Sequence, residues 1–226
     1  MKSRKNTIKD KSYFYGLSVL FKSLYAANIP AVLVGGTAVQ VRIARALAKH
    51  NNSKPDISKI NDIEKYLRPT NDYDICALSK DDALQKVIQG LNIEEEIDDE
   101  IYQIEVSRNG IVKPKIKVYS LNGAYNETEI VLNFSRNASN TNFFKDYYDE
   151  MIFSGEEISL FNEQLKAEIT VAKPEYIVAA KLMRGKERDF HDINLLLNFE
   201  KIDKQELARI MKHEIYRFEN LTDLNH

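Results

Sequence analysis

Residues 31–47, AVLVGGTAVQVRIARAL, decide the fold that we expect for this chain. The apolar run 31–34 is typical of a buried strand, and Gly35-Gly36 indicates a tight turn directly after it. From Thr37 onward, apolar residues recur at the spacing of one helix face: Val39, Ile43 and Leu47. The sequence therefore predicts a strand, a glycine turn and a helix in succession.

The turn Gly35-Gly36-Thr37 is the first candidate site. Glycines let the backbone approach a phosphate closely, and the start of a helix offers free main-chain amides to an anion. Read alone, the same residues also fit an ordinary strand-to-helix turn, because short glycine motifs are weak signals.

A pair of carboxylates, Asp72 and Asp74, begins the next apolar run, for which we expect a strand over 72–78. Alternate residues of a strand point to the same side, so the two side chains converge. Carboxylate oxygens are the ligands that Mg²⁺ prefers, and a cation between them relieves their repulsion. The alternative for this motif alone is a solvated entry to a strand.

The third candidate is the charged segment 181–192, KLMRGKERDFHD. It groups the basic residues Lys181, Arg184, Lys186 and Arg188, followed by Asp189 and Asp192, two acids on one helical face. Such a cluster can hold a triphosphate or a polynucleotide backbone. Without the other motifs, it fits a charged corner between two helices equally well.

Hydrophobic periodicity assigns most of the remaining chain. We expect helices over 13–27, after Ser79 and from Pro174 onward. Apolar alternation predicts strands within 101–134.

Other segments are less sharply patterned. The sequence also allows short strands at 158–161 and 168–172, and the acidic run 94–100 is expected to be a solvated loop or helix end. The predicted fold class is α+β, a mixed sheet flanked by helices in 1–150 and a mostly helical region in 151–226.

Composition excludes several classes of protein. The chain has 226 residues and 43% hydrophobic residues, enough for a sizeable core, and its net charge of −2 does not advertise nucleic-acid binding. A single cysteine, Cys76, cannot form an internal disulfide or a cysteine metal cluster. Neither a secretory signal nor a run of about 18 apolar residues is present, so we expect a cytoplasmic protein without membrane contact.

Taken together and in this order, the three candidates resemble the AbiEii-type nucleotidyltransferases, toxins of type IV toxin–antitoxin and abortive-infection systems within the DNA polymerase β-like superfamily. The matching segments are 34–38, 68–75 and 181–193. The resemblance implies a polymerase β-like core, with Mg²⁺ as the cofactor bound by Asp72 and Asp74. It implies that a nucleoside triphosphate is bound by Gly35, Gly36, Thr37, Arg68, Thr70 and Lys181. The catalytic residues that it implies are Asp72, Asp74, Lys181 and Asp189.

One position departs from the pattern that this resemblance implies. Many polymerase β-like enzymes carry a third carboxylate on a later central strand, where this chain is expected to present Asn133. An amide oxygen can bind a metal but brings no charge and cannot act as a base. If Glu129 or Glu127 is the equivalent residue instead, the expected register shifts by a few residues.

The sequence thus predicts an enzyme that moves a nucleotide from a nucleoside triphosphate to an acceptor hydroxyl, with release of pyrophosphate. RNA, and tRNA in particular, is the expected acceptor, and an antitoxin is a possible partner of such a toxin. Two alternatives stay open: a nucleotidyltransferase acting on a small antibiotic-type acceptor, and a module that binds nucleotide without turnover.

Overall fold

The structure, a computed structural model, describes residues 6–50, 55–97, 99–107, 114–120, 126–137 and 144–212. The main helices are α1 (Lys11–Ala26), α2 (Gly35–His50), α3 (Asp81–Gly90), α4 (Tyr148–Phe153), α5 (Pro174–Arg184) and α6 (Glu187–Phe199). Two short 3-10 helices, η1 (Ile57–Lys59) and η2 (Ile63–Lys65), follow α2, and a further helix occupies 204–212. The strands are β1 (Ala31–Val34), β2 (Asp72–Ala77), β3 (Ile93–Ile97), β4 (Glu100–Ser107), β5 (Lys115–Ser120), β6 (Asn126–Ser135), β7 (Glu156–Asn162) and β8 (Leu165–Val171).

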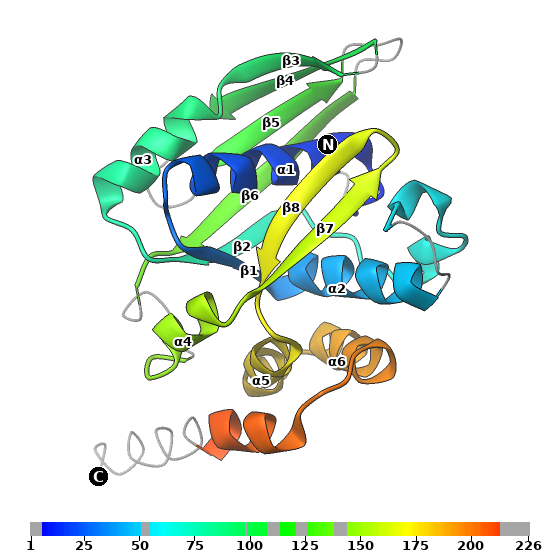
Figure 1. Ribbon diagram of the computed structural model, residues 1–226, viewed down its shortest axis with the longest axis vertical. Helices are drawn as coiled ribbons and strands as arrows, with labels where there is room; N and C mark the ends of the chain where they lie inside the picture. Colours follow the sequence, from blue (N-terminus) through cyan, green and yellow to red (C-terminus); the bar gives the residue numbers. More distant parts are fainter. Residues whose placement is uncertain are drawn as a thin grey trace.

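The strands form one mixed, eight-stranded sheet in the order β3-β4-β5-β6-β2-β1-β8-β7 (Figure 1). Neighbouring strands are antiparallel except β2 with β6 and β1 with β8, which are parallel. Parallel neighbours need long connections, and here the connections from β2 to β6 and from β1 to β8 span much of the chain. The strand that begins with Asp72 consequently lies in the middle of the sheet.

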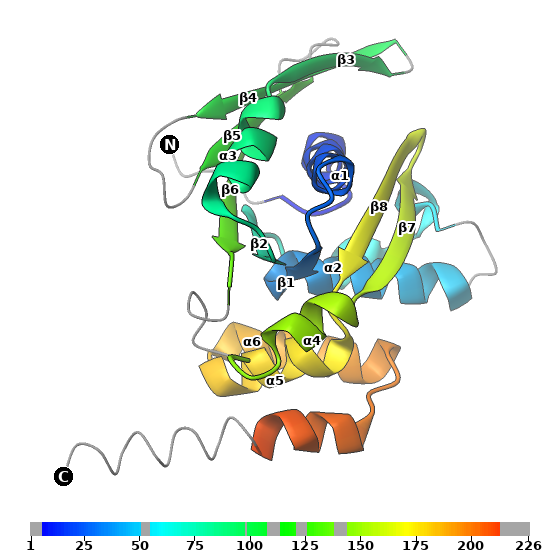
Figure 2. The ribbon, with the colours of Figure 1, turned by 60° about the vertical axis from the view of Figure 1, so that its left-hand side comes forward.

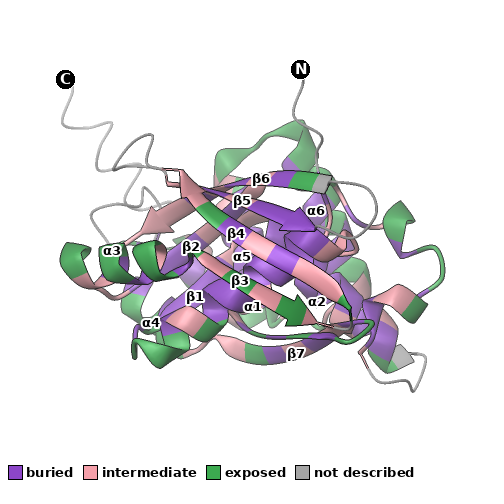
Figure 3. Cartoon of the chain, turned by 90° about the horizontal axis from the view of Figure 1, so that it is seen from above, coloured by how far each residue is buried: buried purple, intermediate pink, exposed green. Residues whose placement is uncertain are grey.

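Helix α1 lies in the hollow of this sheet, between β5 and β6 on one side and β7 and β8 on the other (Figure 2). Its residues Phe14, Leu17 and Phe21 are completely buried, because the curled sheet covers the helix on several sides. Figure 3 shows the same contrast from above, with β5 mostly buried and exposed residues along α3. Removal of this aromatic-rich surface from water is the main source of stability for the core.

Helix α2 connects the sheet to α5 and α6. Arg42 of α2 is completely buried, and its Nε donates a hydrogen bond to the carbonyl oxygen of Ala172 at 2.8 Å. Its guanidinium also pairs with Glu156 at 3.3 Å and with Glu200 at 3.2 Å. These contacts fasten the end of α6 to α2 and so fix the position of the helices that face the carboxyl pair.

Most of the elements expected from the sequence are confirmed. The helix of 13–27 is α1, the strand at 31–34 is β1, and the strand after Asn71 is β2. The alternating residues of 101–134 lie in β4, β5 and β6, and the two short strands near 160 and 170 form the hairpin of β7 and β8. Gly110 and Asn122-Gly123, which the sequence suggests as separators of these strands, fall outside the described residues, as does the chain after 212.

The expectation for the acidic run 94–100 is wrong, because β3 and the start of β4 form a hairpin there. Ile93 and Ile97 share the partly buried side of β3 with Glu95, whose carboxylate accepts a hydrogen bond from the Tyr15 hydroxyl at 3.1 Å. The alternate glutamates face water. Because β3 is an edge strand, its charges discourage pairing with another chain while the ladder to β4 satisfies the backbone.

The predicted division of the chain at residue 150 stays a prediction; β7 and β8, which follow that residue, belong to the common sheet. Across the described ranges, no helix has both the length and the apolar character needed to cross a bilayer.

Candidate active site around Asp72 and Asp74

Strand β2 presents the two predicted carboxylates on one side of the sheet. Tyr73 and Ile75, which alternate with them, are buried on the other side. In the ladder, Asp74 lies opposite Val34 of β1 and opposite Asn133 of β6. The Nδ2 of Asn133 donates a hydrogen bond to Asp74 Oδ1 at 3.0 Å. The register therefore confirms that Asn133 is the neighbour of the carboxyl pair.

Glu127 and Glu129, the alternatives for that position, lie farther back along β6. Glu129 pairs with Lys115 at 2.9 Å and Glu127 with Lys117 at 2.8 Å, both across the β5–β6 ladder. Their charges are thus neutralised within the sheet, away from Asp74.

The glycine turn is required because other side chains fill the space beside it. Gly35 has a φ of +73°, and a Cβ built on it would lie 2.1 Å from Asp74 Oδ2. A Cβ on Gly36 would lie 2.7 Å from Nη2 of Arg68. The first turn of α2 therefore touches both a carboxylate and a guanidinium, and its unpaired amides are at hand for an anion.

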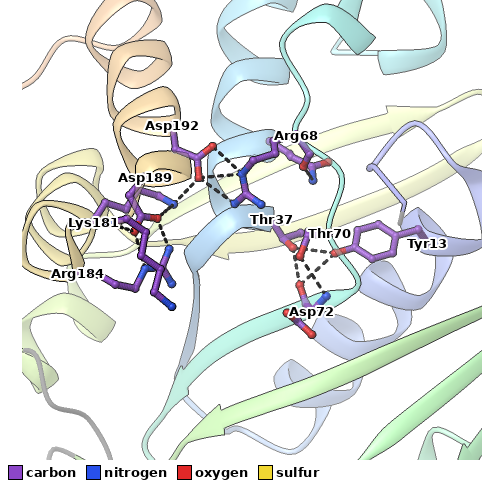
Figure 4. Close-up of polar contacts among 11 residues, drawn as sticks. Tyr13, Thr37, Arg68, Thr70, Asp72, Lys181, Arg184, Asp189 and Asp192 are labelled. Carbon is purple, nitrogen blue, oxygen red and sulfur yellow. Dashed lines mark hydrogen bonds and ion pairs between the residues drawn. The ribbon is translucent and has the colours of Figure 1, made fainter. Parts of the chain in front are cut away.

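Thr37 and Thr70 hold the backbone of Asp72 rather than its carboxylate (Figure 4). The Thr37 hydroxyl donates to the carbonyl oxygen of Asp72 at 2.7 Å and shares a 2.8 Å hydrogen bond with the Tyr13 hydroxyl. The main-chain N–H of Asp72 donates to Thr70 Oγ1 at 3.3 Å. Because Thr37 is completely buried, its predicted role in phosphate binding rests on its main-chain N–H.

A chain of alternating charges faces the strand from α5 and α6 (Figure 4). Arg68 Nη2 lies 2.9 Å from Asp192 Oδ2, and Lys181 Nζ lies 2.6 Å from the same oxygen. Lys181 Nζ is also 3.8 Å from Asp189 Oδ1, and Arg184 Nε donates to Asp189 Oδ2 at 2.7 Å. Lys181, Asp189 and Asp192 are at most 2% exposed, whereas the Arg184 side chain is 33% exposed.

Local geometry explains why these charges meet. Gly185 ends α5 in the left-handed conformation, with a φ of +61°, and so turns the chain into α6. The carboxylate of Asp189 accepts the main-chain N–H of Lys186 at 3.2 Å, which caps the start of α6. Asp192 lies about one turn later on the same helix face.

Burial and neighbouring charge shift the pKa values of these groups. Burial, together with the charge of Asp72, raises the pKa of Asp74 against the opposing hydrogen bond from Asn133. Burial also lowers the pKa of Lys181, although Asp192 opposes that shift. For Asp192, burial alone would raise the pKa, but Arg68 and Lys181 outweigh burial and lower it.

The oxygen atoms around β2 fit a hard divalent cation such as Mg²⁺. Asp72 and Asp74 supply two carboxylates, and the buried Oδ1 of Asn133 has no hydrogen-bond partner. No hydrogen bond or ion pair from the described residues engages the Asp72 carboxylate. Within those same ranges, no three His, Cys, Asp or Glu side chains group together as a metal site. The donor set is therefore two carboxylates and one amide.

The structure thus brings the predicted residues of β2, the glycine turn and Arg68 into direct contact, and it links Lys181 and Asp189 to them through Asp192. Sequence reasoning did not assign Asp192 and Arg184 to the site. Their signal was the spacing of the two acids on one helix face, but their partners, Arg68 and Lys181, could be identified only in three dimensions.

No protein-family model and no curated protein matches the chain. Among solved structures, the fold is similar to that of MenT4, the nucleotidyltransferase toxin Rv2826c from Mycobacterium tuberculosis H37Rv, with a TM-score of 0.51 and 15% identity over 90% of this chain. The chain spans 62% of the length of that protein. The antibiotic-resistance factor ANT(2'')-Ia, with a TM-score of 0.47 and 9% identity, covers 96% of this chain and 98% of its own. The first likeness shows a fold shared with a nucleotidyltransferase.

Proposed function

We propose that this chain is a Mg²⁺-dependent nucleotidyltransferase with a polymerase β-like core, an AbiEii-type toxin or phage-defence effector that acts in the cytoplasm. It transfers a nucleotide from a nucleoside triphosphate to an acceptor hydroxyl, preferably on RNA such as tRNA, and releases pyrophosphate. A cognate antitoxin is its expected partner.

The observation that carries this proposal is the combination of an unpaired carboxylate with an anion-binding turn. Asp72 has its backbone held by Thr37 and Thr70, so its carboxylate is positioned although no described side chain contacts it. The start of α2 contacts Asp74 and Arg68 at the same edge. A bound triphosphate with its cation requires such a juxtaposition of anionic and anion-binding groups.

Each group has a defined part in the reaction. When bound, Mg²⁺ offsets the negative charge of the phosphates and favours attack of the acceptor hydroxyl on the α-phosphate. Asp72 and Asp74 hold that ion, and the amides of Gly36 and Thr37 bind phosphate oxygens. The partly exposed Arg184 offsets charge on the leaving pyrophosphate, as Lys181 does from behind it.

Asp189 is best understood as the residue that orients Arg184. It is completely buried, and both oxygens of its carboxylate contact the Arg184 guanidinium. Burial would raise the pKa of Asp189, but Arg184 and Lys181 together lower it, which disfavours proton uptake. Of the two roles that the sequence left open for Asp189, the contacts support the orienting role over that of a base.

The basic corner between α5 and α6 is where we expect the acceptor to bind. Arg184, Lys186 and Arg188 are all exposed there, beside the Asp189 that caps α6. Three cations on a convex corner suit a phosphodiester backbone better than a small molecule, because each can neutralise a separate phosphate.

The test is transfer of label from each α-³²P nucleoside triphosphate to total tRNA, in wild type and in the double variant Asp72→Asn/Asp74→Asn. We expect label on RNA with wild type, its loss in the variant, and a fall with rising salt. Asp62→Asn, an exposed position on η2, is the matched control and should retain activity. Absence of label from RNA, with label on a small acceptor instead, would replace the RNA acceptor; nucleotide binding without any pyrophosphate release would replace the enzyme by a binding module.

A further inference from the structure

The neighbour of Asp74 on β6 is a neutral residue. Asn133 lies opposite Asp74 in the parallel β2–β6 ladder, and its amide donates to Asp74 Oδ1. The other oxygen, Oδ2, is against Gly35 at the start of α2. Both oxygens of Asp74 are thus in contact with the protein, whereas the Asp72 carboxylate is free of contacts with described residues.

The amide of Asn133 is only half satisfied. Its Oδ1 is buried and has no hydrogen-bond partner, an arrangement that usually costs about 1–3 kcal/mol. Exceptions of this kind in a native site call for a functional explanation. A neutral oxygen beside two carboxylates is suited to complete the coordination of a single cation.

The charges around the pair match one divalent cation. Asp72 and Asp74 together carry two negative charges, and the described residues provide no third acidic ligand. Arg184 and Lys181 lie close enough that their positive charges counteract the raised pKa of Asp74. A second divalent cation would therefore meet net positive surroundings and find an amide where it needs a carboxylate.

We propose that this site binds a single divalent cation together with the nucleoside triphosphate, and that Asn133 sets this number. The inference rests on the proposed function, since it specifies the metal content of the same site. The structure relates it to one side chain: a carboxylate at position 133 would provide the third anionic ligand for a second cation.

The experiment counts Mn²⁺ ions by electron paramagnetic resonance, with and without a non-hydrolysable α,β-methylene nucleoside triphosphate. Wild type is expected to bind one Mn²⁺ per chain in the presence of the nucleotide, and Asn133→Asp is expected to bind two. Asn92→Asp adds the same charge at an exposed position between α3 and β3 and should still bind one.

A melting experiment shows whether the variant is folded. Without metal, Asn133→Asp places a third carboxylate beside Asp74 and should lower the melting temperature. Mn²⁺ should then raise the melting temperature of this variant more than that of wild type.

Each outcome has a distinct meaning. Two Mn²⁺ per wild-type chain would overturn the inference and leave the proposed function intact. One Mn²⁺ in Asn133→Asp, or an equal effect of Mn²⁺ on the two melting temperatures, would show that Asn133 does not set the number. No nucleotide-dependent Mn²⁺ binding to wild type would contradict the proposed function itself.

Discussion

The two sides of the site differ in how completely their polar groups are paired. On the α5–α6 side, Asp189 and Asp192 each contact two cations, and every buried charge has a partner. On the β2 side, the Asp72 carboxylate has no contact with described residues and Asn133 Oδ1 is orphaned. We infer that the helix side is built for stability, and that the strand side keeps its binding capacity for ligands.

Substitution of Asp192 by Asn should cause the largest loss of stability. Both Arg68 and Lys181 would lose their carboxylate, and removing one partner from a buried pair costs about 3–5 kcal/mol. Urea unfolding measures the change, and Asp62→Asn, which affects an exposed pair with Lys65, should change stability by less than about 1 kcal/mol. Equal effects of the two substitutions would mean that the charge chain is not structural.

The converse is expected for Asp72→Asn. We expect transfer to fall by about 10³-fold, because a metal ligand contributes several kcal/mol to the transition state. Stability should stay unchanged or rise, since the substitution removes repulsion with Asp74. Parallel measurement of label transfer and of urea unfolding decides between the two sides: a large loss of stability would show that Asp72 is structural after all.

Gly35→Ala should disturb the strand side through geometry alone. The new methyl group would meet the Asp74 carboxylate, and the backbone would keep an unfavourable positive φ, for a combined cost of about 2–4 kcal/mol. The matched variant is Gly90→Ala, at an exposed helix position where a Cβ meets no atom within 4 Å, and it should be neutral or stabilising. Thermal or urea unfolding of the two variants checks the difference, which vanishes if the turn can relax.

Tyr13→Phe should have the smallest effect. The Tyr13 hydroxyl contacts Thr37 and donates to the carbonyl oxygen of Asp72 at 3.1 Å, so its loss should cost about 1 kcal/mol and displace Asp72 slightly. We expect a several-fold fall in kcat with little change in KM. Tyr66→Phe, whose ring stacks on Phe199, is the control and should leave both constants unchanged.

Local patterns in the sequence were sufficient to predict the strands and the first catalytic element. The apolar run before Gly35 and the alternation around Ile130 and Leu132 identified β1 and β6, and the alternation also gave the register that places Asn133 beside Asp74. These features depend on residues close in sequence. The acidic hairpin was missed because its charges conceal the alternation of Ile93 and Ile97.

The helix side of the site could not be predicted in the same way. Arg68 and Asp192 are 124 residues apart, and nothing in either segment identifies the other as its partner. The burial of Lys181 is likewise set by packing of α5 against α6, not by its neighbours in sequence.

The distance between these partners along the chain also has a consequence during translation. A nascent chain acquires Asp72 and Asp74 early, but it obtains Lys181 and Asp192 only near the end of synthesis. Since Arg42 must also wait for Ala172, the helix that carries the glycine turn is fastened equally late. A ribosome that stops before α6 therefore releases an incomplete site, and the cell encounters the finished one only when nearly the whole protein has been made.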